Sequence, residues 1–419
     1  MAVLLVIFGG ALSYIGESGL PGYVMTLAGL AILLLTPRAR LYTSDRRINL
    51  LAGSYFGVSC LSVAANMDIW RLDMAQTLLY PITFYVVATN WQKFARPGRL
   101  ATFAILSLFV LNGAAALLVS FFGIDVPFAG PNFDNRYIFL TDLRSSSGFM
   151  WNVNYYSACQ AAGFWLLFLI GRTQNVRSAA FNLAVGFVGA SILIGSSRGV
   201  LAAFIISLLV YGASRTPKRY LPLSAVGVAA ALWLVLGGGL SLDLDLIRRG
   251  LRIERGLNSR DSIWLAAWEV IKSHPLFGIA SPSHLRLELL LAGSPVTALQ
   301  NSYLLTAARI GALGLVLTIS IFGFALRRAW RAIRSSAMVA CAVAGLTLIL
   351  TDSLARSYSL GGIGLVPVCL SIFVGLLLAA PNLRGCPRDA SDSSSAALRK
   401  PLRAAPLNRE PAFLQMRKR

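Results

Sequence analysis

Long apolar runs, separated by short polar connections, fill the chain from its first residues to about residue 380. Runs of about 17 to 25 mostly apolar residues are long enough for an α-helix to cross the hydrocarbon core of a bilayer. They lack the alternating polarity of a membrane barrel. The pattern predicts an all-α integral membrane protein. About twelve transmembrane helices are expected, over residues 2–16, 19–36, 49–66, 74–90, 100–122, 147–170, 179–195, 199–213, 220–240, 302–326, 336–353 and 362–380.

Two connections are much longer than neighbouring helices require, at about 123–146 and 241–301. Long ordered loops are usually functional. The second loop lies between the ninth and tenth predicted spans, and LDLDLIRRGLRIERG within it predicts a short amphipathic helix with Arg248, Arg252 and Arg255 on one face. This basic face is expected either to guide anionic headgroups or, as the commoner case, to be solvated.

A further helix is predicted in the same loop, within NSRDSIWLAAWEVIKSHPLFGI. Asn258 or Ser259 suits its N-cap, and Pro275 ends it. One apolar stripe runs along this helix and consists of Ile263, Ala267 and Val270. Trp264 and Trp268 lie one turn apart and suit a membrane interface better than sugar stacking.

Composition agrees with a bilayer environment, because mean hydropathy is +0.67 and only 13% of the residues are charged. Basic residues gather in alternate loops, which marks those loops as cytoplasmic. Together with the C-terminal segment, these loops carry an excess of basic over acidic residues equal to the whole net charge of +21. The basic character therefore reflects topology and attraction to anionic lipid, and nucleic acid is not an expected partner.

This topology places both termini in the cytoplasm and the 241–301 loop on the opposite, extracytoplasmic side. We expect one polytopic domain over residues 1–380, followed by a disordered basic tail over 381–419, which is rich in Ser, Pro, Ala and Arg. No spacing of histidines, cysteines or carboxylates typical of a metal site occurs. Neither a metal nor another cofactor is expected.

A tight polar turn, GSSRG at 195–199, separates two apolar helices and carries Arg198. In the predicted topology this turn lies on the outer side, where the positive-inside rule gives no reason for a cation. The next helix begins here, so its free N–H groups and the hydroxyls of Ser196 and Ser197 would add to the guanidinium as anion donors. The alternative, of equal weight, is that Arg198 reaches lipid headgroups.

Four stretches together resemble the O-antigen ligase and O-antigen/exopolysaccharide polymerase superfamily of bacterial membrane glycosyltransferases. They are SGFMWNVNYYSACQ (147–160), GSSRGVLAAF (195–204), SRDSIWLAAWEVIKSHPLFGI (259–279) and QNSYLLTAARIGALGLV (300–316). Each motif is loose alone, whereas the ordered set around one large loop is more specific. The resemblance covers about residues 147–316.

The resemblance implies transfer of a glycan from undecaprenyl pyrophosphate to an acceptor at the periplasmic face of the bacterial inner membrane. A ligase uses lipid A–core as the acceptor, and a polymerase uses a second lipid-linked repeat. Other membrane proteins of polysaccharide assembly are expected partners. Arginines hold the pyrophosphate in this family, and Arg198 and Arg260 are the matching positions.

Further site residues follow from the same motifs and from polar groups near them. We expect Ser197, Asn301, Tyr303, Arg356 and Arg252 to bind substrate. Two interpretations stay open for the charged residues within the tenth span and near the outer end of the eleventh. Asp352 can form a buried structural pair with either Arg309 or Arg356; alternatively, Arg356 or Arg309 reaches the pyrophosphate, with structure favoured for Arg309.

The general base is the point where the sequence departs from the family. The ligases carry a histidine before Asn-x-Tyr-Leu, whereas this chain has Gln300, which hydrogen-bonds but does not accept a proton. His284 is the substitute considered, with a solvated loop residue as its alternative, and His274 is expected to end a helix. Gln300 therefore favours a polymerase over a ligase.

Two other classes stay open. A transporter or flippase is the main one, and it should show repeated halves and helices broken near the bilayer centre. No internal repeat is evident, and the polar groups cluster at the outer face, which favours the enzyme. A catalytically inactive scaffold of the same fold is the other, because of Gln300.

Overall fold

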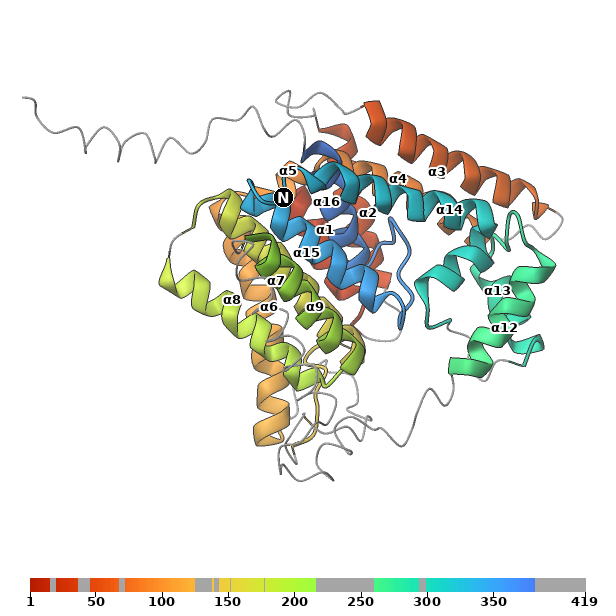
Figure 1. Cartoon of the computed structure of the whole chain (residues 1–419). Coiled ribbons are helices and arrows are strands. Elements are labelled where there is room, and N and C mark those ends of the chain that lie inside the picture. Colours follow the sequence, from red (N-terminus) through yellow and green to blue (C-terminus); the bar gives the residue numbers. More distant parts are fainter. Residues whose placement is uncertain are drawn as a thin grey trace, which may run out of the picture. The chain divides into compact units, whose positions relative to one another are not determined.

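The computed structural model describes residues 1–15, 20–36, 46–67, 72–124, 138, 143–150, 152–176, 178–215, 260–293 and 299–380. The described residues form helices, with no β-strand among them (Figure 1). The helices are α1 (Ala2–Leu12), α2 (Leu20–Leu35), α3 (Arg46–Ala64), α4 (Ala75–Thr89), α5 (Trp91–Ala95), α6 (Arg99–Phe122), α7 (Val153–Thr173), α8 (Ala179–Ser191), α9 (Arg198–Arg215), α12 (Arg260–Ser273), α13 (Pro282–Leu291), α14 (Ser302–Trp330), α15 (Ala337–Asp352) and α16 (Leu365–Ala379), with 3-10 turns η2 (Leu72–Met74) and η3 (Ile192–Gly195).

Each predicted span except the ninth coincides with one of these helices; 220–240 lies outside the described residues, as do 241–259 of the long loop and the 381–419 segment. Four helices are long and apolar enough to cross a membrane, namely α6, α7, α9 and α14. Shorter apolar helices are α1, α2, α15, α16 and the stretch Ala179–Gly195. The chain is a helical membrane protein, while the count of twelve spans stays a prediction.

Helix α1 is shorter than the sequence pattern predicts. It ends at Leu12 after 11 residues, which at 1.5 Å per residue is about 16 Å and well under a bilayer core. It packs along α2 and also contacts α16. Close packing is possible because Gly9 and Gly22 lie where the two backbones meet.

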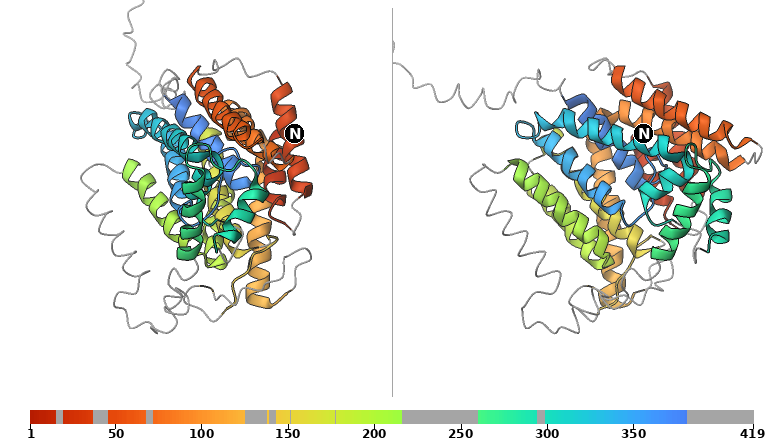
Figure 2. Two further views of the ribbon diagram at one scale, coloured as in Figure 1. Left: turned by 90° about the vertical axis from the view of Figure 1, so that its right-hand side faces the viewer. Right: turned by 45° about the vertical axis from the view of Figure 1, so that its right-hand side comes forward.

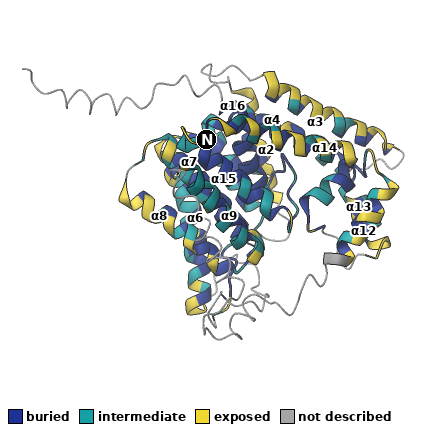
Figure 3. Ribbon diagram, in the orientation of Figure 1, coloured by how far each residue is buried: buried dark blue, intermediate teal, exposed yellow. Residues whose placement is uncertain are grey.

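Helix α16 is the centre of the helical packing, and all of its residues from Leu365 to Ala379 are buried. It contacts α15, α4, α14, α1 and α7, which explains why its sequence is apolar on every side. Its single hydroxyl, Ser371, donates to the carbonyl of Pro367 at 3.0 Å. Peripheral helices instead expose leucines on their outer sides, for example Leu50 and Leu183 (Figure 3), as lipid-facing helices do.

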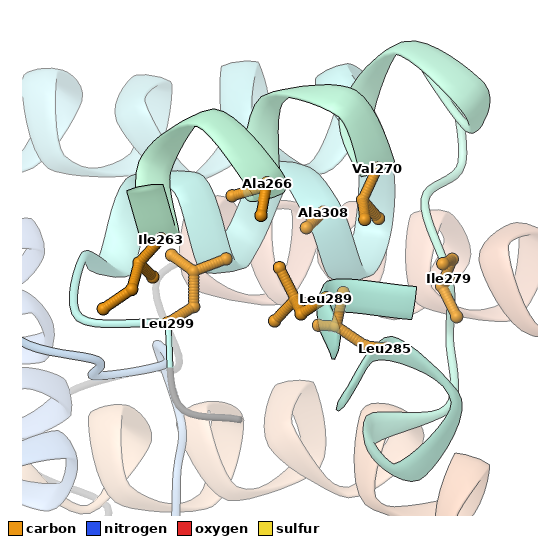
Figure 4. Close-up of a cluster of buried hydrophobic side chains, with 9 residues drawn as sticks. Ile263, Ala266, Val270, Ile279, Leu285, Leu289, Leu299 and Ala308 are labelled. Atoms are coloured by element: carbon orange, nitrogen blue, oxygen red, sulfur yellow. The ribbon is translucent and has the colours of Figure 1, made fainter. Parts of the chain in front are cut away.

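Helices α12 and α13 share a small apolar core with the beginning of α14 (Figure 4). Ile263, Ala267 and Val270 of α12 are buried in it, as the stripe predicts. They meet Leu285 and Leu289 of α13. Each large aliphatic side chain buried in this way contributes about 1.5–3 kcal/mol. The predicted helix end is also confirmed, because α12 stops at Ser273, just before His274 and Pro275.

Helix α14 is broken at Ile310 and Gly311, where Gly311 adopts φ 73° and ψ −177°. The segment after α12 docks into this break: Ile279 N–H donates to the Ala308 carbonyl and Ala312 N–H to the Pro275 carbonyl, both at 2.8 Å. A Cβ on Gly311 would overlap the Leu276 carbonyl oxygen. The PLFG motif and the first glycine of the Gly-x-x-Gly motif are thus two halves of one joint.

Polar side chains of α3 and α4 complete the joint, and both views in Figure 2 show α14 beside α3. Ser62 Oγ donates to the Phe277 carbonyl at 2.6 Å, and Asn66 Nδ2 donates to the Gly278 carbonyl at 3.0 Å. Thr77 Oγ1 donates to the Ala280 carbonyl at 2.6 Å. Backbone carbonyls outside a regular helix need such partners when they are buried.

A Gly311→Ala substitution should destabilise this joint, because alanine disfavours φ 73° and its Cβ would overlap the Leu276 carbonyl. We expect a loss of about 1–3 kcal/mol or more, measured as a lower thermal unfolding midpoint in detergent. Gly323→Ala on the same helix is the matched control, since a Cβ there meets no atom within 4 Å. An equal effect of both substitutions would contradict the role of the joint.

Candidate anion-binding site

The turn before α9 is held in a left-handed conformation. Helix α8 continues into η3, and Ser196 then adopts φ 46° and ψ 34°. Helix α9 begins at Arg198, and the Ser197 carbonyl accepts from Leu201 N–H at 2.9 Å. Ser197 is therefore the N-cap residue. The tight turn predicted at 195–199 is confirmed, and Tyr156 of α7 supports it by donating to the Ser191 carbonyl at 3.1 Å.

Arg356 lies beside this turn, although it is far away in the sequence. Its Nη2 donates to Ser197 Oγ, and its Nε donates to Asp352 Oδ1 at 2.9 Å. The side chain is only 9% exposed. Burial opposes its charge, but Asp352 outweighs that effect and leaves the pKa of Arg356 above its usual value. A permanently charged guanidinium is thus fixed next to the N-terminus of α9.

The structure decides which arginine pairs with Asp352. The partner is Arg356, and Arg309 is not involved. The second carboxylate oxygen, Oδ2, accepts from the Tyr358 hydroxyl at 2.7 Å. Burial, followed by the negative charge of Asp352, raises the pKa of Tyr358, so its hydroxyl stays a donor. Asp352 therefore binds Arg356 and Tyr358 at once.

The beginning of α14 is fastened to the same place through Ser302. Its hydroxyl donates to the Arg356 carbonyl at 2.7 Å and accepts from Tyr358 N–H at 2.7 Å. Its own N–H donates to the Ser353 carbonyl at 2.9 Å. We call Ser197, Ser302, Asp352, Arg356 and Tyr358 the Ser197 cluster; it connects the Ser-Arg-Gly turn to the Asn-x-Tyr-Leu motif.

Two of the predicted substrate-binding residues make contacts within the protein. Asn301 caps α14, accepting from the N–H groups of Tyr303 and Leu304 at 2.9 and 3.0 Å. Its Nδ2 donates to the Leu354 carbonyl at 3.2 Å. The Tyr303 hydroxyl donates to the Leu350 carbonyl at 3.1 Å. Both residues therefore shape the site, and their contact with substrate stays a prediction.

Arg198 and Gln300 differ from the buried members of the cluster because both are exposed. Arg198 follows Ser197 at the start of α9, and Gln300 directly precedes the capping residue Asn301. Each therefore adjoins a buried member of the site in the sequence, and the side chains of both are exposed. The guanidinium of Arg356 is fixed beside Ser197, and guanidinium groups bind phosphate oxygens well.

The other predicted site residues fall elsewhere or outside the description. Arg260 opens α12, but its side chain lies outside the described residues, as does the whole of Arg252. His284 is half-buried on α13, with Nε2 3.5 Å from Glu288 Oε1. The alternative that it is a solvated loop residue is therefore wrong. Its catalytic role stays untested.

Sequence reasoning missed Ser302 and Tyr358. The spacing of four residues between Asp352 and Arg356 did indicate an ion pair. No comparable signal marks Ser302 or Tyr358, because single hydroxyls are common near helix ends. Their role arises only when the loop between α15 and α16 folds against the start of α14.

Fold and site together define a helical membrane protein with an arginine- and hydroxyl-lined site suited to a phosphate group. A family model described as O-antigen ligase matches residues 181–319. The match runs from α8 into α14 and includes the Ser-Arg-Gly turn and the broken helix. This match confirms the resemblance to the O-antigen ligase and polymerase superfamily over these residues. No curated protein matches the chain.

Breaking the buried ion pair should cost more than removing it completely. Asp352→Leu and Arg356→Met alone each leave one uncompensated buried charge and should destabilise by about 3–5 kcal/mol, while the double variant should recover part of that loss. Thermal unfolding in detergent measures the coupling. The exposed Glu269–Lys272 pair is the control, and its removal should change stability by less than about 1 kcal/mol. Strictly additive losses at Asp352 and Arg356 would argue against the pair.

Proposed function

We propose that the protein transfers a glycan from an undecaprenyl-pyrophosphate carrier to an acceptor at the periplasmic face of the bacterial inner membrane. The observation that carries the proposal is the contact of Arg356 with Ser197, which sets a second guanidinium beside the turn of Arg198. The O-antigen ligase domain at residues 181–319 supports this class of reaction. Arg260 is proposed to join the same site from α12.

In this reaction, the bond between the anomeric carbon and the pyrophosphate oxygen breaks as an acceptor hydroxyl oxygen forms the new glycosidic bond. The carrier leaves as undecaprenyl pyrophosphate, and the hydroxyl proton passes to solvent. Negative charge grows on the leaving pyrophosphate, so fixed guanidinium groups stabilise the transition state more than the ground state. The ion pair with Asp352 and the cap at Ser197 hold Arg356 in place before substrate binds.

A polymerase is favoured over a ligase because of Gln300. An amide orients an acceptor hydroxyl by hydrogen bonding but takes no proton from it, so the site relies on stabilising the leaving group. The second candidate is an O-antigen ligase that uses lipid A–core, and the match to the O-antigen ligase family model favours it. The proposed partners in either case are a lipid-linked glycan, an acceptor glycan or lipid, membrane lipids and other proteins of polysaccharide assembly.

Arg198→Ala should abolish glycan transfer without preventing membrane insertion. Loss of one preorganised charge donor in a catalytic site costs about 10²–10³-fold in rate. Transfer of a lipid-linked repeat by purified protein measures it, and Arg260→Ala should behave alike. Arg331→Ala is the matched control, because Arg331 is also exposed but follows the far end of α14. Normal transfer by Arg198→Ala would refute its role.

Gln300→Ala and Gln300→His test how Gln300 acts on the acceptor hydroxyl. If Gln300 only orients the acceptor, alanine should lower the rate by about tenfold or less, and the effect should not depend on pH. Histidine should introduce a dependence on pH near its ordinary pKa of about 6.5. An inactive Gln300→Ala variant with normal stability would contradict the orienting role.

Deleting the gene and separating cell-surface glycans on a gel tests the reaction class. A polymerase predicts lipid A–core that carries a single repeat, or loss of an exopolysaccharide. A ligase predicts uncapped core with accumulated long lipid-linked polymer. Unchanged surface glycans would contradict both.

A further inference from the structure

Arg309 is a buried cation that the proposed reaction has not used. It lies on α14 directly before the break at Ile310 and Gly311, and it is 5% exposed. A charged side chain inside a membrane protein is costly and usually has a functional partner. The identity of that partner is therefore informative.

The contacts of Arg309 leave its charge uncompensated. Nε donates to Thr77 Oγ1 at 2.8 Å, and the guanidinium carbon lies 4.4 Å from the centroid of the Tyr80 ring. No carboxylate in the described part of the chain forms an ion pair with it. Nη2 is buried and has no hydrogen-bond acceptor among the described residues.

A purely structural role explains these contacts poorly. A structural arginine at a broken helix normally binds the carbonyls that the break releases. Here the Ala308 carbonyl, next to the break, already accepts from Ile279 N–H at 2.8 Å. The Arg309 carbonyl shares the hydroxyl hydrogen of Ser62 with the Phe277 carbonyl, at 3.1 and 2.6 Å. These carbonyls therefore have donors other than the guanidinium of Arg309. The Nη2 group keeps a hydrogen-bond donor without an acceptor among the described residues.

This position is separate from the Ser197 cluster. Arg309 follows Ser302 by seven residues, which is about 10 Å along a helix. Thr77 and Tyr80, its contacts, belong to α4, whereas the Ser197 cluster is built from α9, α14 and the loop after α15. Arg309 and Arg356 are therefore held by different sets of side chains.

We propose that Arg309 binds the diphosphate of the acceptor, a second polyprenyl-linked glycan. The inference rests on the proposed function, because in a polymerase both substrates carry a diphosphate. The Ser197 cluster then serves the donor. Thr77 and Tyr80 orient the guanidinium, and Nη2 is the donor that remains for the ligand. A lipid headgroup phosphate offers the same chemistry and is the competing source.

The test uses the full chain in phosphatidylcholine nanodiscs and two acceptors with the same glycan. One acceptor carries a prenyl diphosphate, and the other is an uncharged alkyl glycoside. The unsubstituted protein should show a KM at least about tenfold lower for the diphosphate acceptor. Arg309→Gln should remove this preference and leave the KM of the donor within about twofold. Arg309→Lys should restore part of it.

Several outcomes overturn the proposal. The proposal is wrong if Arg309→Gln still prefers the diphosphate acceptor. It is also wrong if this variant loses turnover equally with both acceptors, because that result indicates a structural role. Arg331→Gln is the control and should keep the preference. Thr77→Val and Tyr80→Leu should weaken the preference even if Arg309→Gln does not fold, and unchanged preference in both contradicts the proposal.

Two further measurements separate the remaining sources. If phosphatidylglycerol raises the unfolding midpoint of the unsubstituted protein but not of Arg309→Gln, while acceptor preference is unchanged, Arg309 binds a headgroup and the proposal fails.

Binding of inorganic pyrophosphate is measured without the glycan-transfer reaction. Two sites per chain are expected, with one lost in Arg309→Gln and the other in Arg198→Ala. Failure of glycan transfer with both pyrophosphate sites present would refute the proposed function alone, whereas a single site lost in Arg198→Ala would refute the role of Arg309.

Discussion

The ion pair of Arg356 with Asp352 is the interaction on which the arrangement of the site depends. The guanidinium of Arg356 is buried, and the Asp352 carboxylate 2.9 Å away compensates its charge. The same arginine then binds Ser197, while Asp352 binds Tyr358. Through these contacts the turn before α9 and the loop after α15 take fixed positions, and Ser302 adds the start of α14. Removing the pair would free the turn before α9 from the loop after α15, whereas Ser302 would keep its contacts with the backbone of Arg356 and Tyr358.

The broken helix α14 solves a second problem of polar groups in an apolar surrounding. A helix that spans a membrane normally satisfies its own backbone, and a break leaves carbonyl and N–H groups without partners. Ile279 N–H and the Pro275 carbonyl supply partners to Ala308 and Ala312 of α14. The carbonyls of the docked segment in turn accept from Ser62, Asn66 and Thr77. The break thereby anchors α12 and α13 to the transmembrane helices. Arg309 directly precedes the break, and its Nη2 group has no hydrogen-bond acceptor among the described residues.

The chemistry proposed for the protein follows from where the cations are fixed. Arg356 is held by a counter-ion, so its field at the site is moderated and its position is precise. Arg198 is exposed at the start of α9. Arg309 contacts the Tyr80 ring and the Thr77 hydroxyl, and it forms no ion pair with a carboxylate among the described residues. A donor and an acceptor that both carry diphosphate require two such positions, and neither position needs a proton-accepting residue for the leaving group to depart.

Much of this protein could be predicted from the sequence, because burial in a bilayer imposes length and polarity on each helix. Apolar runs located the helices, the turn at Arg198 was visible as a polar break, and the spacing of Asp352 and Arg356 indicated a pair. The choice of Arg356 over Arg309 as partner of Asp352 was decided by tertiary structure alone. Tertiary structure also decided the contact of Gly278 with Gly311 and the attachment of Ser302 to the loop after α15. The last two contacts join residues distant in the sequence, and local periodicity carries no information about which distant segments meet.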